Sequence, residues 1–310
     1  MNAAPSGALS RAWPAPAKIN LFLHVTGRRE DGMHCLQTIF QLLGYGDLLD
    51  FRVREDGQLR ALSGLPGLAP ERDLGLRAAA LLQASSGTRM GADIFTRKRL
   101  PAGGGLGGAS SNAATVLVAL NCLWGTGATA AELAAIGLAL GADVPVFVHG
   151  RTAWAEGVGE CLEPCAPDRR WFLVVAPGVS VSTAAVFGSA QLTAESPRIK
   201  IQSFSLASAR NDCEPVTRAM YPEVARAMDW LAARAPCRMT GSGGCVFAAF
   251  AARAEAAALL AELPAPWRGF VAQGLGRSPL QGRLLRALRG NGWRGGSGAR
   301  EGVPGERTGV

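Results

Sequence analysis

The first part of the chain alternates between short apolar patterns of the strand type and longer ones of the helix type. Residues 17–25 alternate apolar and polar side chains, which is the period of a half-buried strand, and Lys18 and Asn20 share its polar face. The same reasoning predicts strands at 47–53 and 92–100 and helices at 73–83, 113–124 and 131–140. Pro145 forbids simple continuation of the last of these helices.

A second set of elements begins after Glu160. It is predicted to contain a strand at 171–177, helices within 212–234 and a strand at 245–250. After Leu280 the composition changes to arginine and glycine, so residues 281–310 are predicted to form a largely disordered tail apart from a short helix at 284–288. Periodicity alone therefore predicts a mixed α and β protein and no finer fold class.

The distribution of charge limits the partners of the chain. Of the formal net charge of +8, a net +4 lies in residues 281–310, which hold six arginines and two glutamates. The remaining, mildly basic body suits an anionic small substrate, and with only two tyrosines in the chain, stacking platforms for single-stranded nucleic acid are scarce. A nucleic-acid-binding protein that acts through its arginine tail stays open as an alternative.

The chain lacks the sequence features of metal-binding and membrane proteins. Its seven cysteines form no CxxC pair and only three histidines accompany them, so reduced structural thiols are expected and no metal site is predicted. The N-terminus has no apolar signal core, and no run of about 18 apolar residues occurs. The chain is therefore expected to be cytoplasmic, with no membrane partner and no nucleic-acid partner.

A glycine-rich loop before a predicted helix carries the clearest chemical signal. Residues 103–108 contain five glycines and precede the helix at 113–124, whose N-terminus offers unpaired N–H groups and the positive end of the helix dipole to an anion. Glycines let the backbone approach a phosphate closely, and Ser110 and Ser111 add hydroxyl groups that can donate to a phosphate or coordinate a metal. The loop is therefore predicted to bind phosphate groups.

The loop does not match the motifs of the common phosphate-binding protein classes well. Ala109 follows Gly108 where a Walker A loop needs a lysine, and the HRD and DFG motifs of protein kinases are absent. The pattern Gly103-x-Gly105-x-x-Gly108 satisfies the dinucleotide fingerprint, but the preceding segment is polar and no acidic residue stands about 20 positions later in a strand. A dinucleotide-dependent oxidoreductase is therefore kept only as an alternative.

The loop resembles the ATP loop of the GHMP kinases, the superfamily of galactokinase, homoserine kinase and mevalonate kinase. The residues that carry this likeness are Pro101, Ala102, Gly103, Gly104, Gly105, Leu106, Gly107, Gly108, Ala109, Ser110 and Ser111. Further strings resemble the branch of the superfamily that phosphorylates a cytidine-diphosphate-linked methylerythritol. They lie, in the order expected of that branch, at 16–23, 31–34, 141–147, 157–160, 211–214 and 241–244.

This resemblance implies an α+β, two-lobed GHMP kinase fold, with an N-terminal lobe like ribosomal protein S5 domain 2 and a ferredoxin-like C-terminal lobe. The ATP-binding lobe with the catalytic residues is expected at 1–160, the C-terminal lobe at 161–280 and the tail at 281–310. ATP and Mg²⁺ are the expected cofactors, and the expected reaction phosphorylates the 2-hydroxyl of the methylerythritol part in the non-mevalonate isoprenoid pathway. A GHMP kinase that acts on another small alcohol, of the homoserine or mevalonate type, is the alternative. The chain is expected to act as a monomer or a homodimer.

The resemblance also implies catalytic roles. A hydroxyl group that attacks the γ-phosphorus must lose its proton, and Asp143 is the candidate base. Lys18 is the candidate cation that keeps Asp143 ionised and orients the hydroxyl. Asn20 is expected to contact the methylerythritol diphosphate part of the substrate.

Recognition of the nucleobase is expected from three further residues. His34 resembles the residue that reads the cytosine edge, and Phe187, with Thr183 nearby, resembles the aromatic residue that stacks on the base. Met33 stands where the family usually has tyrosine. The cytosine is therefore expected to have an aromatic ring on one side only, with the polarisable sulfur of the methionine on the other.

Overall fold

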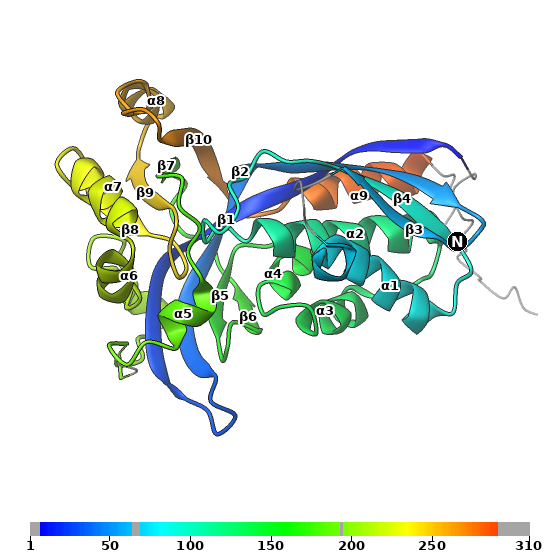
Figure 1. Ribbon diagram of the computed structural model, residues 1–310, viewed down its shortest axis with the longest axis horizontal. Helices are drawn as coiled ribbons and strands as arrows, with labels where there is room; N and C mark the ends of the chain where they lie inside the picture. The colour runs from blue at the N-terminus through cyan, green and yellow to red at the C-terminus, as the bar shows by residue number, and fades with distance from the viewer. Residues whose placement is uncertain (1–6, 64–68, 193–194, 291–310) are drawn as a thin grey trace, which may run out of the picture.

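Two long antiparallel strands run through the middle of the protein and connect its two halves (Figure 1). β1 (Leu9–Arg28) pairs with β2 (His34–Arg54), and interruptions in their register let the pair bend. The structure is a computed structural model that describes residues 7–63, 69–192 and 195–290. The strand predicted at the start of the chain forms the central part of β1.

Further strands extend this pair into one sheet of ten strands within the described residues. They are β3 (Leu59–Ser63), β4 (Gly91–Arg97), β5 (Ala153–Glu156), β6 (Cys161–Pro164), β7 (Trp171–Ala176), β8 (Cys237–Met239), β9 (Val246–Phe250) and β10 (Arg268–Leu275). The order is β3-β4-β2-β10-β7-β9-β8, with β1 and β5 also paired to β2 and β6 paired to β5. The last of these strands in the sequence, β10, lies between β2 and β7 and so joins the two halves of the sheet.

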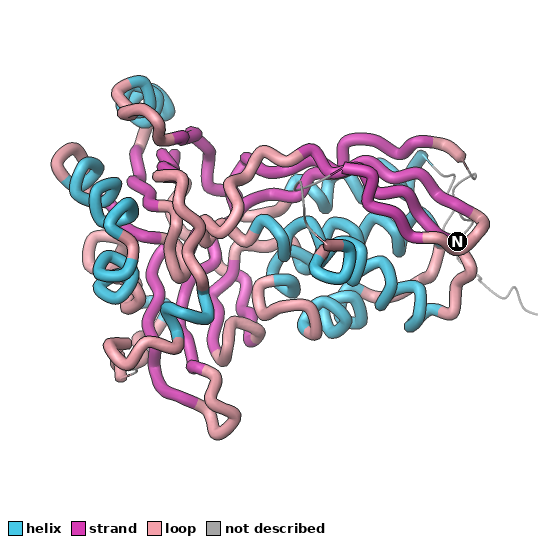
Figure 2. The backbone as a smooth tube through the Cα atoms, in the orientation of Figure 1, coloured by secondary structure: helices cyan, strands magenta, loops and turns pink. Residues whose placement is uncertain are grey.

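Helices cover the sheet in two separate groups (Figure 2). The first group consists of α1 (Leu74–Ser86), α2 (Gly108–Trp124), α3 (Ala130–Leu138) and α4 (Val144–His149), preceded by the short 3-10 turn η1 (Pro70–Arg72). The second group consists of α5 (Thr183–Phe187), α6 (Glu214–Met220), α7 (Pro222–Ala232) and α8 (Arg253–Ala261), with the 3-10 turn η2 (Ile201–Ser203). None of the described helices has the length and apolar character needed to cross a membrane.

Each group of helices packs around its own apolar core. In the first, α2 is buried along most of its length, and Trp13, Phe51 and Phe147 contribute fully buried rings. In the second, the apolar face of α7 packs with Val175 and Met239 of the sheet. Among the described strands, β3 and β4 pair in parallel and all other pairs are antiparallel. A largely antiparallel sheet with separate groups of helices confirms the predicted α+β class.

The end of the described chain corrects one prediction. Residues 281–310 were expected to be a tail with a helix only at 284–288, but α9 (Pro279–Gly290) is a longer helix that packs against β1 and α2. Leu280 and Leu284 lie one turn apart and face the first core, where Leu280 is fully buried. The beginning of the predicted tail is therefore part of the fold, and its remainder lies outside the described residues.

Candidate active site

The glycine-rich loop is tightly wound where it enters α2. Gly103, Gly105 and Gly107 have φ angles of +63°, +72° and +68°, a left-handed backbone that favours glycine. A Cβ atom at Gly105 would lie 2.2 Å from the carbonyl oxygen of Thr240, so no larger residue fits there. Gly107 caps α2, and the first N–H groups of this helix have no acceptor within it. The loop therefore presents free donors and the positive end of the helix dipole to an anion.

Both halves of the chain hold this loop in place. The backbone N–H of Lys18, on β1, donates to the carbonyl of Leu106 at 3.0 Å. The hydroxyl of Thr240, beyond β8, donates to the carbonyl of Gly105 at 3.2 Å and accepts from the N–H of Asn20 at 3.0 Å. The shape of the loop thus depends on contacts between segments that are far apart in the sequence.

Lys18 and Asp143 form an ion pair beside the loop. Lys18 Nζ lies 3.2 Å from Asp143 Oδ2, and the two side chains are 4% and 31% exposed. The same ammonium group donates to Asn20 Oδ1 at 2.7 Å and lies 5.2 Å from the centre of the Phe40 ring. Asn20 Nδ2 in turn donates to Thr38 Oγ1 at 2.9 Å. The buried ammonium group is therefore held by several partners, while the carboxylate stays accessible to a reactant.

The local sequence explains why Asp143 projects toward Lys18. Helix α3 ends at Leu138, and Asp143 is the N-cap residue of α4, which has Pro145 in its first turn. The proline that prevents continuation of one helix thus begins the next. The Asp143 side chain makes no capping hydrogen bond within the described residues, which leaves its carboxylate free for the ion pair.

Three adjoining cavities surround the loop. The first, here called the base slot, has a volume of about 180 Å³ and apolar walls that include Leu74, Ile94 and Val116. The second, here called the phosphate cavity, has a volume of about 410 Å³ and is lined by the loop. Lys98 and Ala109 line both, so the two cavities meet at the start of α2.

Lys98 is a site residue that the sequence analysis missed. Its ammonium group pairs with Asp47, whose side chain is fully buried. Asp47 also accepts the backbone N–H groups of Arg99 at 2.7 Å and Leu100 at 2.9 Å, which fixes the segment that leads into the loop. A cation therefore lies where the base slot meets the phosphate cavity. The run of basic residues before Pro101 is the feature of the sequence from which this cation could have been predicted.

The third cavity, here called the acceptor cavity, has a volume of about 670 Å³. Ser110, Asp143, Thr183 and Phe187 line both this cavity and the phosphate cavity. Asp143 therefore lies on their border. A group bound in one cavity can meet a group bound in the other at this carboxylate.

The acceptor cavity has an aromatic part. The rings of His34 and Phe187 lie 5.5 Å apart between centroids, with their planes inclined by 41°. Burial lowers the pKa of His34 below the ordinary value of 6.5, and the charge of Arg28 lowers it further, so the neutral ring is favoured at pH 7. Met33, which is 49% exposed, lines the same cavity. This end of the cavity suits a flat, uncharged ring.

The structure brings the predicted site residues together, with one exception. Those that line the phosphate cavity, the acceptor cavity or both are Lys18, Asn20, residues 101–110, His34, Asp143, Thr183 and Phe187. Ser111 is fully buried behind the loop, and its hydroxyl oxygen has no hydrogen-bond partner among the described residues. Ser242, which the sequence analysis did not assign to the site, also lines the phosphate cavity. Its Oγ lies 2.7 Å from Thr183 Oγ1.

Comparisons with known proteins identify the family. Residues 73–151 match the model of the GHMP kinases N terminal domain, and residues 198–269 match that of the GHMP kinases C terminal domain. A 4-diphosphocytidyl-2-C-methyl-D-erythritol kinase of Alkalilimnicola ehrlichii is 62% identical over 275 residues, which cover 89% of this chain and 94% of that relative. The chain belongs to the GHMP kinases. As a kinase of this family it uses ATP.

Further relatives agree with this assignment. A 4-diphosphocytidyl-2-C-methyl-D-erythritol kinase of Halorhodospira halophila is 58% identical over 280 residues, which cover 89% of this GHMP kinase and 97% of that relative. A crystal structure of 4-(cytidine 5'-diphospho)-2C-methyl-D-erythritol kinase superposes with a TM-score of 0.74 at 33% identity, covering 87% of this chain and 100% of that one. A homoserine kinase of Cytophaga hutchinsonii superposes with a TM-score of 0.60 at 16% identity, over 90% and 97% of the two chains, which shows a common fold. The expected GHMP kinase fold is confirmed, and the oxidoreductase alternative is set aside.

Proposed function

We propose that this GHMP kinase transfers the γ-phosphoryl group of ATP to the 2-hydroxyl of 4-diphosphocytidyl-2-C-methyl-D-erythritol, a step of the non-mevalonate route to isoprenoid precursors. Relatives with 62% and 58% identity carry the name of this activity. One structural observation carries the proposal: the ion pair of Lys18 and Asp143 lies where the phosphate cavity meets the acceptor cavity. A phosphoryl donor on one side and a hydroxyl group on the other can react there.

The nucleotide is proposed to lie across the base slot and the phosphate cavity. The apolar walls of the base slot, among them Leu74 and Ile94, suit the flat adenine ring. From there the triphosphate passes Lys98 and reaches the loop, where the N–H groups at the start of α2 donate to its oxygens. The γ-phosphoryl group then faces Asp143 and Lys18.

The proposed chemistry uses the ion pair directly. The hydroxyl oxygen of the acceptor forms a bond with the γ-phosphorus, the bond from this phosphorus to the bridging oxygen breaks, and ADP leaves. Asp143 accepts the proton of the hydroxyl group. Lys18 lies 3.2 Å from Asp143, so its charge orients the carboxylate and stabilises the negative charge on the phosphoryl group in transfer.

Mg²⁺ is part of the proposal as the partner of the nucleotide. Within the described residues no group of three or more His, Cys, Asp or Glu side chains could hold a metal ion by itself. Mg²⁺ in kinase sites needs only one or two protein oxygens, because substrate phosphates and water supply its other ligands. Ser110, which lines the phosphate cavity, offers such an oxygen. A bound Mg²⁺ supplies charge neutralisation for the β- and γ-phosphates.

The acceptor cavity is proposed to hold the cytidine end of the substrate. His34 and Phe187 offer the cytosine a neutral ring for hydrogen bonding and an aromatic face for stacking, with the sulfur of Met33 in the same cavity. Both amide atoms of Asn20 are engaged, with Lys18 and Thr38. We therefore assign Asn20 a role in positioning Lys18, beside any contact with the substrate.

The substrate assignment is tested with a panel of acceptors. The purified chain with ATP and Mg²⁺ is offered 4-diphosphocytidyl-2-C-methyl-D-erythritol, homoserine, galactose and mevalonate, and formation of ADP is measured. We expect turnover of the first compound alone. Preferred turnover of one of the others would place the chain in another branch of the superfamily.

The role of Asp143 is tested by Asp143→Asn, which keeps the shape of the side chain and removes its basicity. We expect kcat to fall by about 10² or more, because proton acceptance is lost. Asp168→Asn is the matched control, since Asp168 is 85% exposed and lines none of the three cavities. Wild-type turnover in Asp143→Asn would remove Asp143 from the mechanism.

A further inference from the structure

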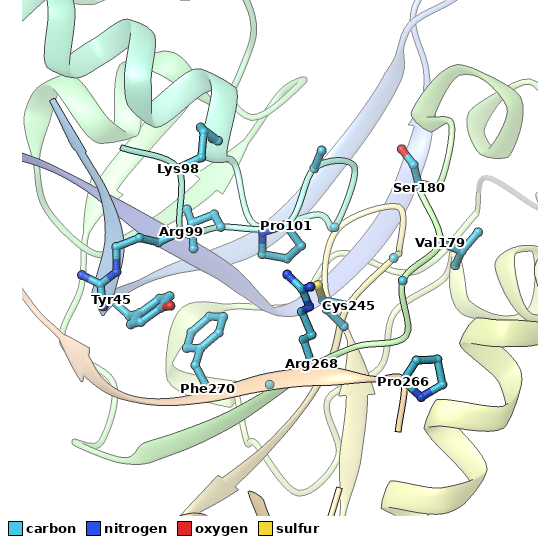
Figure 3. Close-up of a pocket in the computed structure, with 17 residues that line it drawn as sticks. Tyr45, Lys98, Arg99, Pro101, Val179, Ser180, Cys245, Pro266, Arg268 and Phe270 are labelled. Atoms are coloured by element: carbon cyan, nitrogen blue, oxygen red, sulfur yellow. The ribbon is translucent and has the colours of Figure 1, made fainter. Parts of the chain in front are cut away.

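A fourth cavity, here called the rear cavity, lies between the two halves of the chain and has a volume of about 700 Å³. Its walls come from β2, from the segment that leads into the glycine loop, from the segment after β7 and from β10 (Figure 3). It shares Lys98, Pro101, Ala102 and Gly104 with the phosphate cavity. None of the residues to which we assign catalysis or acceptor binding lines it, so it is a separate site that meets the nucleotide site through the loop.

The rear cavity is positively charged. Lys98, Arg99 and Arg268 line it, and none of its described lining residues is an aspartate or glutamate. Asp47 neutralises Lys98, but neither arginine forms an ion pair with another described residue. Figure 3 shows the Arg268 side chain rising from β10 toward Pro101. Two guanidinium groups around a cavity whose described lining holds no acidic residue favour an anion, and the planar donor geometry of a guanidinium group matches a phosphate group.

Aromatic side chains form another part of the wall. The rings of Tyr45 and Phe270 are stacked, 4.1 Å apart and inclined by 16°, and the guanidinium group of Arg99 lies 4.2 Å from the centre of the Tyr45 ring. These contacts fix the Arg99 side chain at the side of the cavity. Val179 and Pro266 add apolar surface. The lining therefore suits a molecule that carries both a phosphate group and an apolar or aromatic body.

We propose that the rear cavity binds a phosphorylated small molecule with an aromatic part, and that this ligand regulates the affinity for ATP. The phosphate group is held by Arg268, and the aromatic part lies along Phe270 and Pro266. The ligand chemistry is that of a phosphate monoester on a flat ring. This site comes in addition to the nucleotide and acceptor sites of the kinase reaction.

The coupling to ATP follows from the wall that the two cavities share. The carbonyl of Gly104 accepts the N–H of the fully buried Cys245 at 3.1 Å, and that of Gly103 accepts the N–H of Val181 at 3.3 Å. A Cβ atom at Gly104 would lie 2.6 Å from Cys245 Sγ, so the backbone of the loop already touches the floor of the rear cavity. A ligand on that side meets the same backbone that cups the triphosphate. Because coupling between sites is reciprocal, ATP changes the affinity for this ligand by the same factor.

The test uses phenyl phosphate as the probe. The chain is first saturated with a non-hydrolysable ATP analogue, so that the glycine loop is filled, and phenyl phosphate is then titrated in a calorimeter. We expect one molecule to bind per chain, and inorganic phosphate to bind more weakly because it lacks the ring. In steady-state assays we expect phenyl phosphate to shift the KM for ATP at constant kcat.

Arg268→Gln provides the decisive variant, since Arg268 belongs to no part of the proposed reaction site. We expect its affinity for phenyl phosphate to fall at least about tenfold, or about 1.4 kcal/mol, with basal kcat and KM unchanged. Arg169→Gln is the matched control, because it removes one exposed positive charge just before β7 and outside the rear cavity, and it should bind like the wild type. Absence of binding to the nucleotide-saturated chain, or equal affinity in Arg268→Gln and wild type, would overturn the proposal. Equal affinities for phenyl phosphate and inorganic phosphate would overturn the aromatic part of it.

Discussion

Replacement of Asn20 by alanine tests how Lys18, the proposed catalytic cation, is held. The Asn20 side chain is buried, with 3% exposure, and it bridges Lys18 Nζ at 2.7 Å and Thr38 Oγ1 at 2.9 Å. Loss of a hydrogen bond to a charged group costs about 1.5–3 kcal/mol and loss of a neutral one about 0.5–1.5 kcal/mol. We therefore expect Asn20→Ala to lower the free energy of unfolding by about 2–4 kcal/mol in urea titrations.

The same change should reduce catalysis. Without the amide acceptor, the ammonium group of Lys18 keeps, among the described residues, its contacts with Asp143 and the Phe40 ring, so its position at the proposed site of the γ-phosphoryl group becomes less defined. We expect kcat to fall about 10- to 100-fold, which corresponds to about 1.4–2.7 kcal/mol, with little change in the KM for ATP. Steady-state kinetics at saturating acceptor measure both constants.

Thr38→Val is the control for Asn20→Ala, because it removes the outer hydrogen bond of Asn20 and leaves the bond from Lys18 in place. It should destabilise the protein and leave kcat within about threefold of the wild type, because the hydrogen bond between Asn20 and Thr38 does not involve the reacting groups. Wild-type kcat in Asn20→Ala would refute the positioning role. An equal loss of kcat in Thr38→Val would show that general destabilisation, and not the Lys18 contact, lowers the rate.

Three further changes test other parts of the structure. Because burial lowers the pKa of His34 below 6.5, the KM for the acceptor should rise as the pH falls below 6.5 and the ring gains charge, and His34→Gln should remove this rise. Gly107→Ala would put a Cβ atom 2.8 Å from the buried Phe147 ring at a φ of +68°, so we expect a raised KM for ATP and a loss of at least about 1–2 kcal/mol of stability in thermal melts. On α9, Leu280→Ala should lower the free energy of unfolding by about 2–5 kcal/mol, because Leu280 is fully buried. Leu285→Ala is the control, since this side chain is 51% exposed, and it should change the free energy of unfolding by about 0.5 kcal/mol or less. Equal effects of the two changes would contradict the packing of this helix against the first core.

The parts of the fold that could be predicted from the sequence are those whose pattern lies within one continuous segment. The strand at 17–25 and the glycines at 103–108 lie within single segments whose patterns stand alone, and the structure places β1 and the start of α2 there. Even so, α2 begins at Gly108 and not at the predicted residue 113, because Gly107 supplies its cap. The segment of α9 was misjudged because its arginines dominate the composition, although its leucines keep a helical spacing.

Contacts between distant residues account for what the sequence did not predict. No element was expected between residues 251 and 278, yet the structure has α8 and β10 there. β10 mixes glycine, glutamine and arginine with apolar residues, and it is a strand because β2 and β7 pair with it on its two sides. The Lys18–Asp143 pair was expected from a family resemblance only, since no local pattern links a residue of β1 to the cap of α4.

The position of β10 and α9 bears on how the chain folds during synthesis. When α8 has left the ribosome, both halves of the chain exist, but the strand between β2 and β7 and the helix that buries Leu280 in the first core are still missing. Until they emerge, β2 and β7 lack the partner that joins them and expose hydrogen-bonding edges of the kind that promote misassembly. The nascent chain therefore completes its first core last, although most of that core is made first, and we expect a ribosome-associated chaperone to bind at these two strand edges.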